Sequence, residues 1–165
     1  MTGKVGEADD DHVFSLGLST APVSDWRFYG SMYTERYMKL LSENEAGYNA
    51  TAIRNTTNFA SIPGKFSLTH GTGDDNVQYQ NAAALVDLFV GDRISPSKFE
   101  MVAFTDSDHS IKYHGANEWL YRYLAGELYA ERNRVVTEPL VHQWGKREDV
   151  VGGTLTGKRD VKFVA

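Results

Sequence analysis

Residues 65–76, KFSLTHGTGDDN, decide the fold of this chain, because they join a short apolar run to a glycine-rich turn that ends in acidic and amide side chains. A second stretch at 99–110, FEMVAFTDSDHS, repeats this plan. Its nearly continuous apolar run is typical of a central parallel strand covered on both faces. Polar groups that directly follow parallel strands gather at the carboxyl edge of the sheet. The sequence therefore predicts an α/β fold with a mostly parallel sheet, flanking helices and functional groups in these two turns.

The rest of the chain alternates between strand-like and helix-like patterns. Strands are expected at residues 13–23, 65–70 and 99–105, the first ending near a proline. Helices are expected at 79–90 and 116–134, with loop and short helix at 26–38 and 48–59. In the last helix the expected buried stripe is Trp119, Leu120, Tyr123, Leu124, Leu128 and Tyr129, and the residues expected to face water are Glu127, Glu131, Arg132 and Arg134.

Composition limits the classes of function. With 165 residues, 41% apolar and 24% charged, the chain is expected to form one domain at most. A net charge of -5 with scattered Lys and Arg offers no basic patch, so a nucleic-acid partner is not expected. No apolar run approaches the roughly 20 residues that span a bilayer. The absence of cysteine excludes disulfides and thiolate metal sites, and neither a metal nor a cofactor is expected.

Asp74 and His109 follow two successive predicted strands in the chain order of the Ser…Asp…His triad of α/β-hydrolases. In such a triad the carboxylate orients the imidazole, and the imidazole moves the nucleophile's proton. Gly/Asp/Asn clusters after strands are also ordinary turns, so either motif alone is weak. Their joint order and placement favour an acid–base pair, although no Gly-x-Ser-x-Gly precedes them.

Ser19 is the one candidate nucleophile inside the chain, because GLSTA at 17–21 matches a relaxed elbow pattern. A nucleophile elbow must turn at once into a helix. Pro22 disfavours helix at the residue before it, so the chain is expected to continue extended. A small esterase that uses Ser19 is therefore a minor alternative.

Three strings carry a resemblance to a known family: APVSDWRFYGSMYTERYM at 21–38, HGTGDDNVQYQN at 70–81 and FTDSDHSI at 104–111. They resemble the C-terminal catalytic region of the dipeptidyl peptidase IV branch of the prolyl oligopeptidase family, most closely the fungal vacuolar dipeptidyl aminopeptidases. The resemblance implies that residues 1–145 are the C-terminal portion of an α/β-hydrolase peptidase domain, incomplete and starting just after the nucleophile elbow. Residues 146–165 are expected to be a disordered polar tail.

The resemblance also implies roles for individual residues. Asp74 resembles the triad acid, His109 the triad base, and Asn76 the residue that hydrogen-bonds the substrate backbone. Residues that resemble the walls of a pocket for a penultimate proline are Val23, Trp26, Tyr29, Tyr33 and Val77. From the residues alone, ordinary core packing is the favoured explanation for Trp26, Tyr29 and Tyr33, and the resemblance reverses this preference.

Three residues depart from the family pattern. Gly30 stands where Asp is common, Gln78 where His is common, and Ser110 where Gly commonly follows the catalytic histidine. The first two are expected to loosen support for the pocket. Ser110 is expected to narrow the backbone choices of the loop that presents His109.

The implied function is a serine exopeptidase that releases N-terminal X-Pro or X-Ala dipeptides. This chain lacks the serine and is expected to be inactive and poorly soluble alone. A non-catalytic pseudopeptidase module that binds a partner remains an alternative. The resemblance further implies a homodimer for the full-length enzyme, and membrane attachment only through an N-terminal anchor that is absent here.

The compartment expected from the resemblance is the secretory pathway, with the lumenal side of the fungal vacuole membrane first and secretion second. Two sequons agree with such a route. Asn49-Ala50-Thr51 and Asn55-Thr56-Thr57 lie in a polar segment, where Asn49 and Asn55 are candidates for glycosylation.

Overall fold

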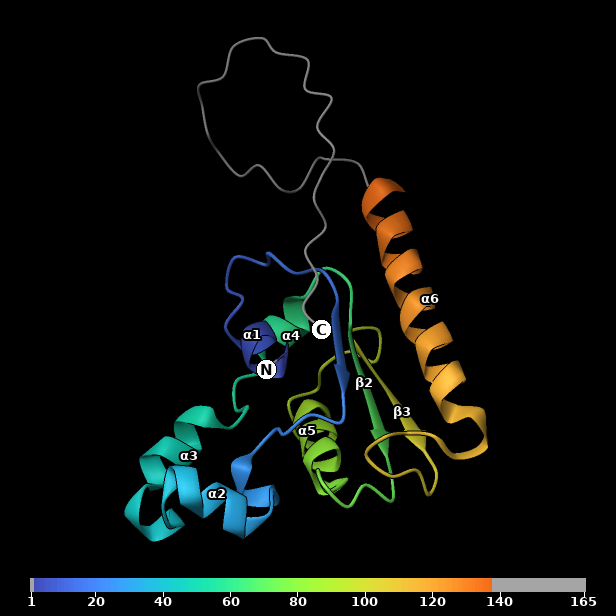
Figure 1. Cartoon of the computed structure of the whole chain (residues 1–165). Helices are drawn as coiled ribbons and strands as arrows, with labels where there is room; N and C mark the ends of the chain where they lie inside the picture. The colour runs from blue at the N-terminus through green and yellow to red at the C-terminus, as the bar shows by residue number, and fades with distance from the viewer. Residues whose placement is uncertain (1, 138–165) are drawn as a thin grey trace, which may run out of the picture.

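The computed structural model describes residues 2–137 and places one parallel sheet between two layers of helices (Figure 1). The strands are β1 (Gly17–Thr20), β2 (Phe66–Gly71) and β3 (Phe99–Phe104), in the order β1-β2-β3. Both pairings are parallel, with Gly17 opposite Phe66 and Phe66 opposite Phe99. The expected α/β class with a parallel sheet is confirmed.

Helices precede, separate and follow the strands along the chain, with α2, α3 and α4 all between β1 and β2. The α-helices are α1 (Thr2–Glu7), α2 (Ser31–Met38), α3 (Glu45–Thr51), α4 (Thr57–Ser61), α5 (Gln80–Gly91) and α6 (Ala116–Thr137). Three short 3-10 helices are η1 (Trp26–Phe28), η2 (Leu41–Glu43) and η3 (Tyr113–Gly115). The predicted helices at 79–90 and 116–134 correspond to α5 and α6, and α1 was not expected.

The first predicted strand, 13–23, was wrong at both ends. At its start, the backbone N–H groups of Val13 and Phe14 donate to the Asp9 carboxylate at 2.9 Å each, so they are not available for a strand ladder. At its end, Ala21 adopts a positive φ of 46° directly before Pro22. The apolar run is therefore strand only over β1, and its ends are loop.

The two faces of the sheet bury separate cores. On one face, β2, α4, α5 and neighbouring loops contribute one buried cluster, which consists of Ile53, Phe59, Phe66, Leu68, Ala82, Leu85, Phe89 and Ile94. On the other face, Phe104, Ile111 and Leu120 pack together beneath α6. Both sides of β2 are buried along its whole length, as expected for a central strand. The prediction that the apolar run at 99–105 is the central strand was wrong, because β3 lies at an edge of the described sheet and is mostly only partly buried.

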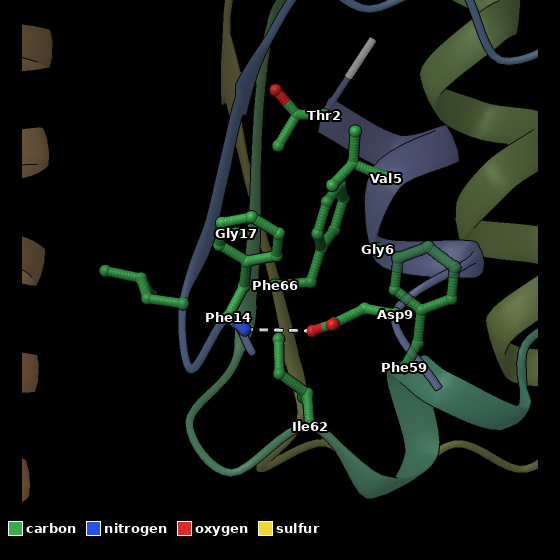
Figure 2. A pocket seen from close by; sticks show the side chains of 10 residues that line it. Thr2, Val5, Gly6, Asp9, Phe14, Gly17, Phe59, Ile62 and Phe66 are labelled. Atoms are coloured by element: carbon green, nitrogen blue, oxygen red, sulfur yellow. Dashed lines mark hydrogen bonds between the residues drawn. The ribbon is translucent and has the colours of Figure 1, made fainter. Parts of the chain in front are cut away.

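The α1 corner closes one end of the first core around two glycines (Figure 2). A Cβ added at Gly17 would lie 2.5 Å from the Phe66 ring, and one at Gly6 would lie 3.1 Å from the Phe59 ring. Absence of these methyl groups lets α1 and β1 approach the aromatic rings. An apolar cavity of about 20 Å³ remains among these side chains.

The predicted faces of α6 were partly wrong. Leu120 is buried, but Trp119 and Tyr129 are half to two-thirds exposed. Glu131, expected to face water, is 5% exposed and accepts hydrogen bonds from the Arg134 guanidinium at 2.6 and 2.8 Å. The narrow sheet offers α6 a contact along only part of its apolar stripe, and the Arg134 partner makes burial of Glu131 possible.

Two sequence expectations fall outside what the structure covers. The end of the expected domain, 138–145, and the expected tail, 146–165, lie outside the described residues. Across residues 2–137, no helix has the length and apolar character needed to cross a membrane.

Candidate active site

The candidate site lies where all three strands end, at one edge of the sheet (Figure 1). β1 leads into the aromatic segment 21–38, β2 into the turn 72–77, and β3 into the turn 105–111. Segments that are distant in the sequence therefore meet because parallel strands end at the same edge.

The two turns after β2 and β3 interlock through their backbones. The Thr72 N–H donates to the Phe104 carbonyl at 2.9 Å, and the Gly73 N–H donates to the Ser107 carbonyl at 3.1 Å. A Cβ at Gly71 would overlap the Ser107 carbonyl oxygen, so this close approach requires glycine. The turn that carries Asp74 is thus held against the turn that carries His109.

Asp74 is buried and its carboxylate accepts several hydrogen bonds. Oδ2 lies 2.8 Å from Nδ1 of His109. Oδ1 accepts from the backbone N–H groups of Asn76 at 3.0 Å and Val77 at 2.9 Å. The His109 side chain is 44% exposed, whereas that of Asp74 is fully buried. A buried carboxylate therefore fixes one nitrogen of an imidazole whose other nitrogen can face a reactant.

His70 is a further member of this arrangement. It is fully buried on β2, with Nε2 2.8 Å from the Val77 carbonyl and 3.3 Å from Asp74 Oδ2. Because both neighbours only accept, Nε2 must carry the proton. Nδ1 has no hydrogen-bond partner within residues 2–137. A buried nitrogen without a partner is less costly as an acceptor than as an N–H donor.

The residues on either side of His109 in the chain fix the conformation of its loop. The Asp108 carboxylate accepts from the Ser110 N–H at 3.0 Å and from the Ser110 hydroxyl at 2.6 Å. The hydroxyl bond and the backbone N–H groups of Ser110 and Ile111 lower the pKa of Asp108. Ile111 is 1% exposed and has a φ of 49°, a left-handed conformation that a β-branched residue rarely adopts. Burial of Ile111 thus offsets backbone strain two residues after His109.

An aromatic cluster lies beside this pair. Trp26 and Tyr29 contact edge to face at 5.5 Å, and Tyr29 and Tyr33 at 5.4 Å. The Tyr29 hydroxyl donates to Oδ1 of Asn76 at 2.8 Å. Of the five residues expected to form a pocket, three therefore form one cluster, which a hydrogen bond joins to the Asp74 turn.

Val23 and Val77 belong to the two segments that the Tyr29–Asn76 hydrogen bond joins. Val23 and Trp26 line a broad open groove of about 970 Å³, which also contacts β1 and α6. Val77 is 6% exposed and lies in the turn after Asp74. The structure thus places Val23 beside Trp26 on the open groove and Val77 in the turn that carries Asp74.

The departures from the family pattern have different structural settings. Gly30 is the N-cap of α2, and no side chain makes a capping bond there. Gln78 is exposed, and its carbonyl accepts from the Asn81 N–H at 3.0 Å. Ser110 is held to Asp108, and its backbone does not require glycine.

Ser19 does not have the setting of an elbow nucleophile. It lies inside β1 opposite Leu68 and is 7% exposed. The strand continues past it to Thr20, and no helix follows directly. A nucleophile elbow would need a sharp strand-to-helix turn at this point.

The two candidate glycosylation sites lie on the surface. Asn49 on α3 and Asn55 in the following loop are both exposed. The described part of the chain holds no group of three or more His, Cys, Asp or Glu side chains that could bind a metal ion.

A buried carboxylate that orients an accessible imidazole, at the carboxyl edge of a parallel sheet, is the arrangement of the triad acid and base in an α/β-hydrolase. The family model of the prolyl oligopeptidase family matches residues 1–126. The chain therefore belongs to the prolyl oligopeptidase family, as the sequence motifs predicted.

Curated relatives agree with this assignment. The chain is 60% identical over 147 residues to a protein named probable dipeptidyl peptidase 4 from Emericella nidulans, covering 89% of this chain and 19% of that protein. It is 57% identical over 148 residues to a protein of the same name from Aspergillus flavus, covering 90% and 19%. The chain thus spans about a fifth of the length of these relatives.

Solved structures agree as well. The crystal structure of Porphyromonas gingivalis dipeptidyl peptidase 4 matches 71% of this chain and 16% of that one, with 34% identity and a TM-score of 0.63. A putative dipeptidyl aminopeptidase IV from Bacteroides ovatus matches 80% and 17%, with a TM-score of 0.64. The latter is 22% identical and supports the fold alone.

Sequence reasoning missed two residues that organise the site. His70 stands inside the motif HGTGDDN but received no role, since a histidine on a strand gives no local sign of what it faces. Asn81, fully buried at the start of α5, was read as part of a helix. The only signal in the sequence is an asparagine placed directly before the apolar positions of the predicted helix.

Proposed function

We propose that this chain is the C-terminal part of a serine-type dipeptidyl aminopeptidase, which releases X-Pro or X-Ala dipeptides from peptide N-termini. One observation carries the proposal. The Asp74–His109 hydrogen bond of 2.8 Å lies next to an aromatic cluster that Tyr29 joins to Asn76. An acid–base pair beside a small apolar recognition surface is what such a peptidase needs.

In this mechanism Asp74 accepts from Nδ1 of His109 and thereby fixes the tautomer of the imidazole. Nε2 is then free to accept the proton of a serine hydroxyl as the serine attacks the scissile carbonyl. The same nitrogen returns that proton to the leaving amine. We place the serine in sequence outside these 165 residues, because the chain covers only 19% of its relative and has no Gly-x-Ser-x-Gly.

The aromatic cluster supports a preference for a small or cyclic residue before the scissile bond. Flat rings of Trp26, Tyr29 and Tyr33 offer a pyrrolidine ring a rigid apolar surface at little entropic cost. The Asn76 amide accepts from Tyr29 through Oδ1, so its Nδ2 hydrogens can donate to a peptide carbonyl.

A chimeric enzyme tests the proposal directly. The matched segment of this chain would replace the corresponding 147 residues of the Emericella nidulans relative, and hydrolysis of Gly-Pro-p-nitroanilide would be measured. We expect steady release of p-nitroaniline from the chimera. The 165-residue chain alone is expected to show none, because loss of a triad nucleophile costs about 10⁶ in kcat. A folded but inactive chimera would contradict the proposal and favour a non-catalytic binding module.

Matched variants of the chimera assign the two roles. Asp74→Asn is expected to lower kcat by about 10⁴-fold, and His109→Gln by a similar or larger factor. Asp75→Asn and His114→Gln change exposed residues of the same types nearby and should leave kcat within about twofold. Equal losses in both sets would argue against a specific acid–base pair.

The proposal includes passage through the secretory pathway, with the fungal vacuole membrane as the first expected destination and a homodimer as the expected assembly. The exposure of Asn49 and Asn55 supports this route. Expression of the chimera behind a secretory signal in yeast, followed by endoglycosidase digestion, should show a mass shift. Replacement of Asn49 and Asn55 by glutamine should make this mass shift smaller. The remaining shift should come from glycans on the part of the chimera that the Emericella nidulans relative supplies.

A further inference from the structure

Asn81 makes a set of buried hydrogen bonds that the proposed catalytic mechanism does not use. Its Oδ1 accepts from the backbone N–H groups of Ser24 at 3.1 Å and Asp25 at 3.3 Å. Its Nδ2 donates to the carbonyls of Phe28 at 3.0 Å and Gln78 at 3.3 Å. The Ser24 hydroxyl donates to the Asn81 carbonyl at 2.7 Å. One fully buried residue thus uses every hydrogen-bonding position of its side chain.

These bonds join two separate parts of the candidate pocket. Residues 24–28 connect Val23 to Tyr29 and carry Trp26, so the Asn81 amide holds both ends of this short stretch within the aromatic segment. Asn81 itself lies on the first turn of α5, a few residues after Asn76 and Val77. No helix or strand ladder joins these two parts within the described residues, because 24–28 lies beyond the end of β1.

Other contacts hold the start of this segment from the loop after α3. The Ile53 N–H donates to the Ser24 carbonyl at 2.9 Å, and the Arg54 guanidinium pairs with the buried Asp25 carboxylate at 3.1 Å. Neither contact reaches the Asn76–Val77 turn, so neither sets the distance across the pocket.

Trp26, Tyr29 and Tyr33 contact one another, but Tyr33 is 52% exposed, so the rings are not packed into a core. The Tyr29–Asn76 hydrogen bond is exposed and spans the same gap. A single exposed side-chain hydrogen bond fixes distance less firmly than a buried amide with four partners.

From this geometry we propose that Asn81 is a positioning residue that sets the width of the penultimate-residue pocket, and thereby the preference for proline over alanine. It does not touch the substrate. It acts by holding the backbone of the aromatic segment at a fixed distance from the Asn76–Val77 turn. This inference rests on the proposed function and names the residue that determines its specificity.

The test uses the active chimera described above and two substrates, Gly-Pro-p-nitroanilide and Gly-Ala-p-nitroanilide. Asn81→Leu keeps a similar volume and removes all the side-chain hydrogen bonds. We expect the ratio of kcat/KM for the proline substrate to that for the alanine substrate to fall about tenfold, within the range that shape discrimination in an apolar pocket supplies. The change should lie in KM for the proline substrate, with kcat for the alanine substrate within about threefold.

Asn58 supplies a matched control. It is also a buried asparagine, and its Nδ2 donates to the Glu7 carbonyl and to Asp10 Oδ1, both at 2.9 Å, at the α1 corner. Asn58→Leu should lower the melting temperature to a comparable extent and leave the proline-to-alanine ratio unchanged. An equal change of the ratio in both variants, or no change in Asn81→Leu, would overturn the inference.

Ser24→Ala keeps the test decisive if Asn81→Leu does not fold. It removes one hydrogen bond of the same set and should lower the ratio about twofold to tenfold. A folded Ser24→Ala chimera with an unchanged ratio would overturn the inference. Loss of activity in the unsubstituted chimera would instead reject the proposed function, so the two failures are distinct.

Discussion

At the scale of single residues, Gly30 is a position where the chain lacks a stabilising contact. It is the N-cap of α2 with φ -54° and ψ 121°, and no side chain satisfies the first N–H groups of the helix. An added Cβ would meet nothing within 4 Å. An aspartate at an N-cap accepts hydrogen bonds from these N–H groups, and its negative charge interacts favourably with the positive end of the helix dipole.

Gly30→Asp in the chimera should therefore raise the free energy of unfolding by about 0.5 kcal/mol. Because α2 carries Tyr33, KM for the proline substrate should fall or stay constant. Urea unfolding of the two proteins measures the difference. A loss of stability would mean that the α2 N-terminus is not accessible to a capping side chain.

His70 is the second residue whose role the structure defines. Its Nε2 donates to the buried Val77 carbonyl at 2.8 Å, and removal of this donor leaves that carbonyl unpaired. His70→Leu should lower the free energy of unfolding by about 1–3 kcal/mol.

His70→Gln is the control for His70→Leu, because its amide can place an N–H near the position of Nε2. Denaturant unfolding should show a smaller loss for glutamine than for leucine. If both variants lose the same amount, shape and not the hydrogen bond holds this part of β2.

At the scale of elements, α6 is fastened to the sheet by buried and partly buried charges. Lys65 at the start of β2 pairs with Glu100 on β3 and with Glu127 on α6, the latter at 3.0 Å. Burial alone would raise the pKa of Glu131, but hydrogen bonds from Arg134 and Ser15 hold it below its usual range.

The lowered pKa of Glu131 gives a pH dependence with a definite sign. A carboxyl whose pKa is lower in the folded state stabilises the fold above its unfolded pKa of about 4.3, and this contribution is lost as the pH falls through the folded pKa. Glu131→Gln should therefore lower stability by about 1–3 kcal/mol at pH 7. The gap between variant and parent should narrow below about pH 4. Thermal melts of the chimera from pH 3 to 7 would show this, and a constant gap would contradict it.

At the scale of the whole molecule, the three-stranded sheet has an open edge. Within residues 2–137, β1 pairs only with β2. The open groove of about 970 Å³ next to it is lined by Leu16, Leu18, Leu124 and Leu128 among others. Unpaired strand edges and exposed apolar surface favour association with other chains.

The 165-residue chain alone is therefore expected to aggregate or to melt without a cooperative transition. Gel filtration and calorimetry of the purified chain measure both properties, and the chimera serves as the soluble comparison. A monomeric elution profile together with a single cooperative melt would contradict this expectation.

The sequence by itself determined the family, the parallel sheet and the residues that end its strands. HGTGDDN and TDSDHS each follow an apolar run, and this local order is enough to bring Asp74 and His109 to one edge of the sheet. The helix at 79–90 was predictable for the same reason, since its apolar period is local.

Only the tertiary structure decided how these parts are held. The ends of β1, the left-handed Ile111, the burial of Glu131 and the hydrogen bonds of Asn81 depend on specific contacts that the hydrophobic pattern does not record. Asn81 bonds to Ser24, 57 residues earlier, and no periodicity records such a partner. A sequence pattern reports local backbone preference and burial, whereas packing selects which buried polar groups meet.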